Sequence, residues 1–130
     1  MKQVVLLLII SLPVLLGFTP TQRPSQRSTK QAAIVEFTDK TKVGEAILLG
    51  EYYFEHDDSR MERGEPCMYV YACEGKIPGK LVVSFHCRPV ERSKARDVIV
   101  SLAMTDSPDV FLLKEIQFEG STKGHLVPGA

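Results

Sequence analysis

The chain has 130 residues, of which 44% are hydrophobic, and its 16 basic and 16 acidic side chains leave no formal net charge. This length fits a single domain. A balanced charge argues against a protein that binds nucleic acid or anionic lipid through bulk electrostatics. The apolar content is too high for a disordered chain, and three cysteines are too few for a disulfide-dense miniprotein.

The N-terminal segment is typical of a secretory signal peptide. A basic residue, Lys2, precedes an apolar run of 15 residues from Val4 to Phe18. This run is shorter than the roughly 18 to 20 residues that a spanning helix needs, and Pro13 interrupts it. We therefore predict a signal peptide at residues 1–21 and an exported protein, periplasmic or extracellular. The alternative is a retained N-terminal segment, which would be the expected membrane contact.

Residues 22–32 predict a flexible basic linker, because they contain Arg23, Arg27 and Lys30 but no acid and no large apolar side chain. Behind the leader and linker, residues 33–130 hold 12 basic and 16 acidic side chains and so carry a net charge of −4. An acidic block repels a phosphate backbone, which strengthens the exclusion of nucleic acid as a partner.

The block 33–130 predicts a single all-β domain. Stretches rich in β-branched and aromatic residues alternate with turn signals built from Gly, Pro, Asp and Ser. Seven short strands are expected, at residues 33–38, 46–49, 52–56, 67–73, 81–90, 97–104 and 110–119. This number and spacing favour an antiparallel β-sandwich or an open barrel.

Several connections are predicted from local composition. Gly50-Glu51 indicates a tight turn, and residues 74–80, with two Gly and one Pro, indicate a loop. Residues 112–118 could form a short helix instead of a strand, because their apolar side chains also fit helical spacing. The Gly-rich end, residues 120–130, is expected to be a mobile tail.

A charged loop at residues 57–66 (DDSRMERGEP) interrupts the strands. Its side chains Asp57, Asp58, Arg60 and Arg63 form the candidate interaction surface. A calcium site is the alternative, but the acids do not follow the spacing of an EF-hand loop, and the two arginines would repel the ion.

Three cysteines in an exported chain predict one disulfide and one free thiol. If residues 67–73 and 81–87 pair as an antiparallel hairpin that places Cys73 opposite Leu81, then Cys67 lies directly opposite Cys87. Facing Cα atoms in an antiparallel pair are about 4.5 to 5.5 Å apart, which is within disulfide reach. The predicted disulfide is therefore Cys67–Cys87, and Cys73 is expected to be a small buried thiol.

A copper or zinc site is the alternative use of these residues. His56 and His86, together with Cys67 or Cys87, offer nitrogen and sulfur ligands that suit both metals. No Cys-x-x-Cys or His-Glu-x-x-His pattern supports the site. In the predicted register His86 and Cys87 point to opposite faces of one strand and would not both bind without a bulge. The leading expectation is that no cofactor is bound.

The sequence carries no recognisable catalytic pattern. Ser84 and His86 share one face of a strand about 7 Å apart, too far for a nucleophile to hydrogen-bond to its base. A Gly-x-Ser-x-Gly elbow and a phosphate-binding Gly-rich loop are both lacking. A protein that is not an enzyme is expected, with a small hydrolase using Ser84 as a further alternative.

Residues 50–57 (GEYYFEHD) and 118–125 (FEGSTKGH), together with the leader, resemble parts of small secreted bacterial β-domain proteins that have no assigned function. The resemblance implies an exported bacterial β domain and assigns no functional residue. We therefore expect a non-catalytic exported β domain with a binding or structural role in the cell envelope. Its partner would be an unidentified protein or envelope component.

Overall fold

The computed structural model of the chain describes residues 30–129. They form eight strands and one short helix: β1 (Lys30–Val43), β2 (Ala46–Asp57), α1 (Asp58–Glu62), β3 (Met68–Glu74), β4 (Ile77–Phe85), β5 (Arg88–Glu91), β6 (Ile99–Met104), β7 (Val110–Gln117) and β8 (Lys123–Leu126). The predicted all-β class is confirmed. The predicted signal peptide and residues 22–29 of the predicted linker lie outside the described residues, and no helix within residues 30–129 is long and apolar enough to cross a membrane.

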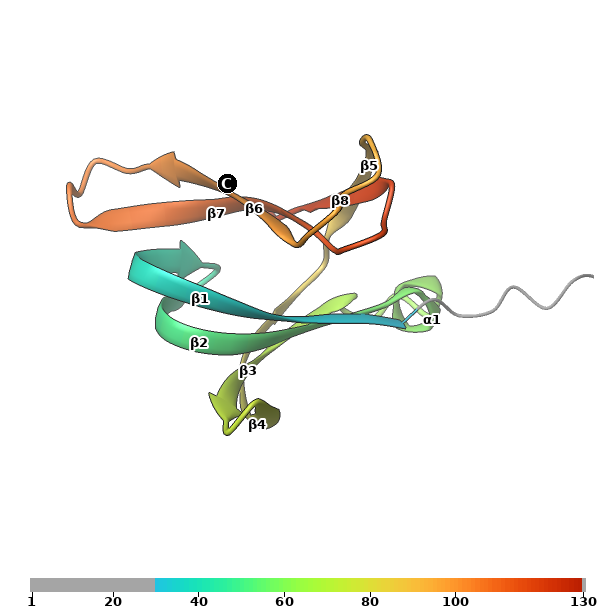
Figure 1. The fold of residues 1–130 in the computed structure, drawn as a ribbon, viewed down its shortest axis with the longest axis horizontal. Coiled ribbons are helices and arrows are strands. Elements are labelled where there is room, and N and C mark those ends of the chain that lie inside the picture. The colour runs from blue at the N-terminus through green and yellow to red at the C-terminus, as the bar shows by residue number, and fades with distance from the viewer. Residues whose placement is uncertain (1–29, 130) are drawn as a thin grey trace, which may run out of the picture.

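The strands form one mixed, strongly curled sheet shaped like half of a barrel (Figure 1). Their order is β4-β3-β2-β1-β7-β8-β5, and β6 pairs with β7 outside this path. The pairs are antiparallel except for β1 and β7, which run parallel. The curl turns the half made of β1–β4 toward the half made of β5–β8, and the chain crosses between them after β4 (Figure 1). Of the two predicted architectures, a sandwich or an open barrel, this half-barrel is nearer to the open barrel, with eight strands instead of seven and one parallel pairing.

The β1–β2 hairpin turns at Gly44, whose positive φ of 59° is readily adopted by glycine. Gly50, at a φ of 95°, lies inside β2 and not in a turn. The register of the hairpin shifts between Phe37, which faces this glycine, and Thr41. The predicted turn at Gly50-Glu51 is therefore wrong, because the glycine allows an irregularity within one continuous strand.

The β3–β4 hairpin has a turn at Gly75 and Lys76, with φ values of 59° and 70°. Two successive positive φ values are typical of a tight type I′ turn, which suits the twist of the strands. Because the turn is so short, β4 already begins at Ile77. The predicted loop at residues 74–80 is therefore wrong over its second half.

The register of β3 with β4 also differs from the predicted one. Cys73 pairs with Pro78 and not with Leu81, and irregularities interrupt the ladder. A shift of one residue exchanges the two faces of a strand. The core side of β3 includes Met68 and Val70, which are fully buried.

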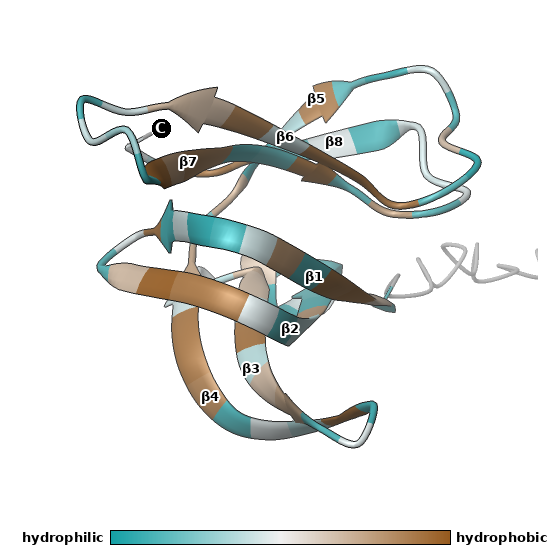
Figure 2. Ribbon diagram, turned by 60° about the vertical axis from the view of Figure 1, so that its left-hand side comes forward, coloured by the Kyte–Doolittle hydropathy of each residue, from teal (hydrophilic) through white to brown (hydrophobic). Residues whose placement is uncertain are grey.

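The hydrophobic core fills the inside of the curl. Figure 2 shows hydrophobic stretches on strands of both halves, including β2, β4 and β7. The buried apolar side chains form one cluster, made of Val35, Phe37, Val43, Leu48, Phe54, Cys67, Met68, Val70, Phe85, Leu113, Ile116, Phe118 and Val127. Five polar side chains of the described residues are also buried, among them His56 and His125, one from each half of the sheet.

Two segments that were expected to be irregular contain regular elements. The charged loop includes α1, which begins after Asp57, whose carboxylate accepts a hydrogen bond from the Ser59 amide at 2.9 Å. The predicted mobile tail includes β8, which pairs antiparallel with β5 and β7. This part of the tail is therefore a strand, and its pairing places His125 in a buried position. The helix considered at residues 112–118 is the strand β7 instead.

Candidate functional site

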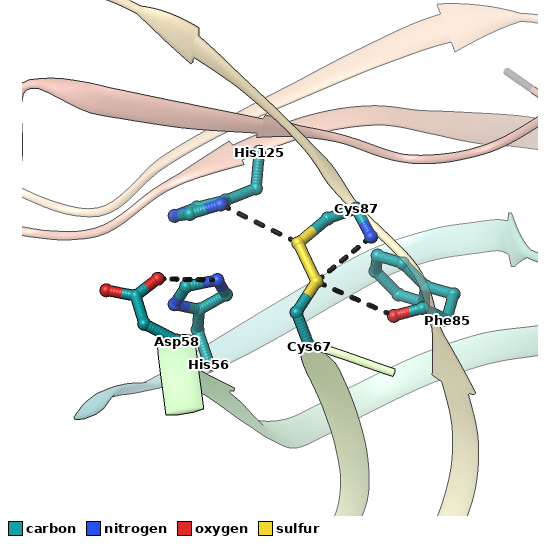
Figure 3. The surroundings of a disulfide bond; sticks show 6 residues. All are labelled: His56, Asp58, Cys67, Phe85, Cys87 and His125. Carbon is teal, nitrogen blue, oxygen red and sulfur yellow. Dashed lines mark hydrogen bonds and ion pairs between the residues drawn. A yellow bond between two sulfur atoms is a disulfide. The ribbon is translucent and has the colours of Figure 1, made fainter. Parts of the chain in front are cut away.

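Four side chains with reactive atoms converge between the two halves of the sheet: His56, Cys67, Cys87 and His125 (Figure 3). His56 lies near the end of β2 and Cys67 directly precedes β3, whereas Cys87 follows β4 and His125 is in β8. The Asp57 amide donates a hydrogen bond to the Cys67 carbonyl at 3.0 Å, which fixes Cys67 beside the end of β2. The pairing of β8 with β5 brings His125 to the strand that follows Cys87.

The two cysteines of this cluster form a disulfide, so the predicted Cys67–Cys87 pair is confirmed. Their Cα atoms are 6.2 Å apart, within the usual range. The two cysteines are close together for a different reason than predicted. They do not face each other within the ladder but lie just beyond the paired ends of β3 and β4. Cys73, the remaining cysteine, is free and half-buried.

The two histidines lie ring against ring beside the disulfide. Their ring centroids are 4.0 Å apart, and the ring planes are tilted by 34°. His56 is 1% exposed and His125 is 3% exposed. The Phe118 ring packs on both, with centroid distances of 6.3 Å to His56 and 5.8 Å to His125. Because Nδ1 of His125 is also 3.7 Å from Sγ of Cys87, the imidazoles and the sulfur atoms form one contiguous buried cluster.

Three imidazole nitrogens of this cluster are buried without a hydrogen-bond partner in the described part of the chain: Nδ1 and Nε2 of His56, and Nε2 of His125. An oxygen of Asp58 is 3.7 Å from Nε2 of His56, which is too long for a hydrogen bond. Burying a polar atom without a partner costs about 1 to 3 kcal/mol. Such atoms call for an explanation, and a ligand that they bind is one.

Burial keeps both rings neutral. It lowers the pKa of His56, and the negative charges of Asp58 and Asp57 offset this effect only in part. Burial, followed by the nearby His56 and Lys123, lowers the pKa of His125 to about 4. At neutral pH both imidazoles therefore have a free lone pair, and the neutral ring is the form that binds a metal ion.

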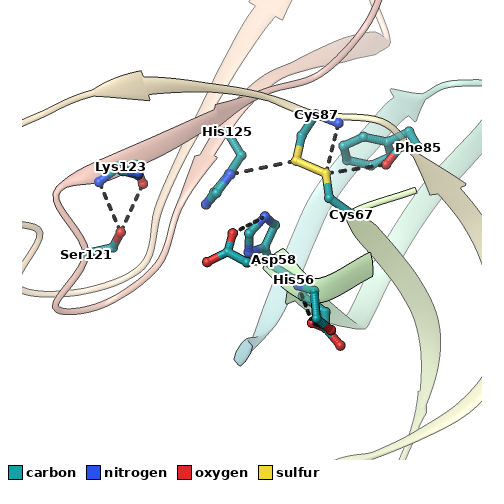
Figure 4. Close-up of polar contacts among 10 residues, drawn as sticks. His56, Asp58, Cys67, Phe85, Cys87, Ser121, Lys123 and His125 are labelled. Carbon is teal, nitrogen blue, oxygen red and sulfur yellow. Dashed lines mark hydrogen bonds and ion pairs between the residues drawn. A yellow bond between two sulfur atoms is a disulfide. The ribbon is translucent and has the colours of Figure 1, made fainter. Parts of the chain in front are cut away.

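A cavity of about 280 Å³, here called the histidine cavity, reaches both imidazoles. Its remaining wall consists of Gln31, Asp58 and residues 120–123. Figure 4 shows Ser121 and Lys123 on the His125 side of the cluster, where the Lys123 amide donates to Oγ of Ser121 at 3.0 Å. The histidine cavity therefore borders both histidines, although their ring nitrogens are themselves buried.

A second cavity, of about 340 Å³, reaches Cys87 and is here called the Cys87 cavity. It is lined by His86, Arg88 and residues 126–129 in addition to Cys87. It shares no lining residue with the histidine cavity. The cluster is therefore bordered by two separate cavities, one at the two histidines and one at Cys87.

The structure brings together most of the ligands considered for the metal alternative. One ligand atom each from His56, Cys67 and Cys87 lies within 4.8 Å of the others. His86 is exposed and is not a member of this group. His125, which no sequence pattern marks, lies next to Cys87 instead. It follows Cys87 by 38 residues, so only the pairing of β8 brings the two together.

The charges of the predicted interaction loop are largely paired within the protein. Nε of Arg60 is 3.8 Å from the Asp57 carboxylate, and its guanidinium carbon lies 4.1 Å from the centre of the Tyr69 ring. Arg63 forms an ion pair with a neighbouring glutamate at 3.0 Å. Asp58 is the member of the loop that borders the histidine cavity. A role of the loop as a partner surface stays a prediction.

Comparison with known proteins adds no functional assignment. No family model, no curated protein and no solved structure matches the chain. The chemistry of the cluster is nevertheless well defined. Its two sulfur atoms form a disulfide, which reduction would convert into two thiols, and two buried imidazoles lie beside them.

Proposed function

We propose that the protein is a non-catalytic β domain that binds a soft metal ion, zinc or copper(I), when its disulfide is reduced. The ligands would be the thiolates of Cys67 and Cys87 and the imidazoles of His56 and His125. The observation that carries the proposal is the convergence of two sulfur atoms with buried imidazole nitrogens that have no hydrogen-bond partner in the described chain.

The donor set fits a tetrahedral metal site. Zinc binds sulfur at about 2.3 Å and imidazole nitrogen at about 2.0 to 2.1 Å, which places neighbouring ligand atoms roughly 3.3 to 3.8 Å apart. Nδ1 of His125 and Sγ of Cys87 are already 3.7 Å apart. The potential ligand atoms of His56, Cys67 and Cys87 lie within 4.8 Å of one another, so small side-chain rotations suffice. Two cysteines and two histidines are a common set for zinc, and copper(I) also favours sulfur.

This proposal revises the metal alternative that the sequence suggests, with His125 in place of His86. It also specifies a metal ion as the ligand for the expected binding role of an exported β domain in the cell envelope. The apolar leader supports export, and the Cys67–Cys87 disulfide agrees with it, since such bonds persist in oxidising compartments. The two oxidation states would then make metal binding depend on the redox conditions that the protein meets.

Cobalt titration tests the proposal because Co²⁺ occupies zinc sites and reports thiolate ligands through a charge-transfer band. The purified protein is reduced with a phosphine, which leaves no competing thiol, and is titrated under nitrogen. We expect one equivalent of cobalt per chain with the thiolate band, and displacement by zinc. A protein without this band after reduction contradicts the proposal.

Variants separate the site from unspecific binding. Cys67→Ser and His125→Ala should each lower the affinity by at least about tenfold, as for the loss of one ligand or its support. His86→Ala and Cys73→Ser are matched controls, because they remove a histidine and a cysteine outside the cluster and should leave the titration unchanged. An equal loss of cobalt affinity in the two control variants would contradict the assigned ligands.

A further inference from the structure

We infer that a small anionic thiol opens the disulfide by attacking Sγ of Cys87 through the Cys87 cavity. The inference concerns the control of the proposed metal site and rests on that function only for its biological consequence. Its first support is the unequal burial of the two cysteine residues. Cys67 is completely buried, whereas Cys87 is half-buried and lines a cavity of about 340 Å³. A thiol that enters this cavity therefore approaches the disulfide from the side of Cys87.

The reaction is a thiol–disulfide exchange in two steps. In the first step the incoming thiolate forms a bond to Sγ of Cys87, the bond between Cys87 and Cys67 breaks, and its electron pair leaves on Sγ of Cys67. In the second step another thiolate attacks the first thiol's sulfur and releases Cys87 as a thiolate. Two thiols are thereby oxidised to one low-molecular-weight disulfide, and the two cysteines are reduced.

The surroundings of Cys67 suit it to be the leaving group. The backbone amide of Cys87 donates a hydrogen bond to Sγ of Cys67 at 2.9 Å (Figure 3). A hydrogen bond to a charged acceptor is stronger than one to a neutral acceptor, so this amide stabilises the negative charge that develops on Cys67. Attack at Cys67 would place the charge on Cys87 instead, whose Sγ has the longer contact of 3.7 Å with Nδ1 of His125 but no backbone amide donor among the described residues.

The charge of the Cys87 cavity selects the attacking thiol. Arg88 lines this cavity and is exposed, and no acidic side chain is among the described lining residues. A permanent positive charge at the mouth of a cavity raises the local concentration of an anionic reactant. A thiol that carries carboxylates, such as glutathione, therefore fits better than a neutral one.

The direct test traps the mixed disulfide. The oxidised, purified protein is exposed briefly to glutathione, quenched with acid, alkylated and mapped by mass spectrometry. We expect glutathione on Cys87 and the alkyl group on Cys67, in an excess of about tenfold over the reverse arrangement. Glutathione mainly on Cys67, or equally on both, would overturn the inference.

The role of Arg88 is tested by comparing the rates at which two thiols reduce the disulfide. Arg88→Gln should slow reduction by glutathione roughly two- to threefold at low ionic strength, and leave reduction by the neutral 2-mercaptoethanol unchanged. Arg96→Gln is the matched control, because Arg96 is exposed and lines a different cavity. Equal slowing with both thiols, or no slowing with either, would refute the selection of an anionic thiol.

Failure of this inference and failure of the proposed function have different outcomes. Cobalt binding is measured on protein reduced with a phosphine and does not depend on which sulfur a thiol attacks. A normal cobalt titration with glutathione mapped to Cys67 refutes the site of attack alone. Glutathione mapped to Cys87 without any cobalt binding refutes the metal site alone.

Discussion

Acidification should destabilise the oxidised protein through His125. The ordinary pKa of histidine is about 6.5 in an unfolded chain, and burial lowers the pKa of His125 to about 4 in the folded protein. Between these two values the unfolded chain binds a proton that the folded protein does not bind. The free energy of unfolding therefore falls as the pH falls from about 6.5 to about 4, and this contribution is constant above 6.5.

The size of the effect follows from the difference between the two pKa values. At 1.36 kcal/mol for each pH unit, His125 accounts for a loss of about 3 kcal/mol between neutral pH and pH 4. His56, whose pKa is also lowered by burial, acts in the same direction. A loss of this size is a large part of the 5 to 15 kcal/mol that stabilises a typical domain.

Guanidinium unfolding at a series of pH values measures this loss. Carboxylates also titrate in this range, so the quantity of interest is the difference between the native protein and His125→Gln, which removes the titrating ring. The native protein should lose about 3 kcal/mol more than the variant between pH 7 and pH 4. His86→Gln removes an exposed imidazole and serves as the matched control. Equal pH dependence in the native protein and His125→Gln would refute the reasoning.

Three further predictions concern stability. Cys67→Ser should lower the free energy of unfolding by about 3 kcal/mol, because the disulfide links residues 20 apart; an unchanged denaturation midpoint would contradict this. Gly50→Ala should cost about 1 kcal/mol or more, since alanine disfavours a φ of 95°, and an unchanged melting temperature would speak against the strain. Phe118→Ala should lower the free energy of unfolding by roughly 3 to 5 kcal/mol. A loss below about 1 kcal/mol would contradict a stabilising role for the packing of this ring on the two histidines.

The fold class was predictable because the sequence patterns of strands can be recognised even where a turn or a strand boundary is predicted wrongly. Alternating β-branched and aromatic residues mark most of the strands, and these patterns do not require knowledge of which strand pairs with which. The parallel pairing of β1 with β7 was not predictable in this way. It joins residues about 70 positions apart, near Lys40 and Val110, and no local signal specifies it.

Turns and register were less predictable because a glycine with a positive φ can lie either in a turn or within a strand. Gly50 and Gly75 both have positive φ values, yet the first lies within a strand and the second in a tight turn. The misplaced turn before β4 moved the predicted register of β3, and a change of register exchanges the faces of a strand. The Cys67–Cys87 pair was nevertheless predicted correctly, because the ends of one hairpin stay close in either register.

The candidate site was predictable only in part. His56, Cys67 and Cys87 were recognised by their residue type, and the structure does bring them together. His86 was considered as a further nitrogen ligand, but it is exposed. His125 lies in a Gly-rich segment that resembles a mobile tail, and its burial depends on β8 pairing with β5 and β7. Long-range strand pairing therefore decides which histidine belongs to the cluster.

X-ray absorption spectroscopy of the reduced, zinc-loaded protein tests the central claim most directly, because it reports the atoms bound to the metal. The proposed site predicts two sulfur atoms at about 2.3 Å and two imidazole nitrogens at about 2.0 Å. The His125→Ala protein should lose one nitrogen of this set, whereas the His86→Ala protein should keep all four ligands. A spectrum with only oxygen and nitrogen neighbours, or one that His86→Ala alters and His125→Ala does not, would contradict the account.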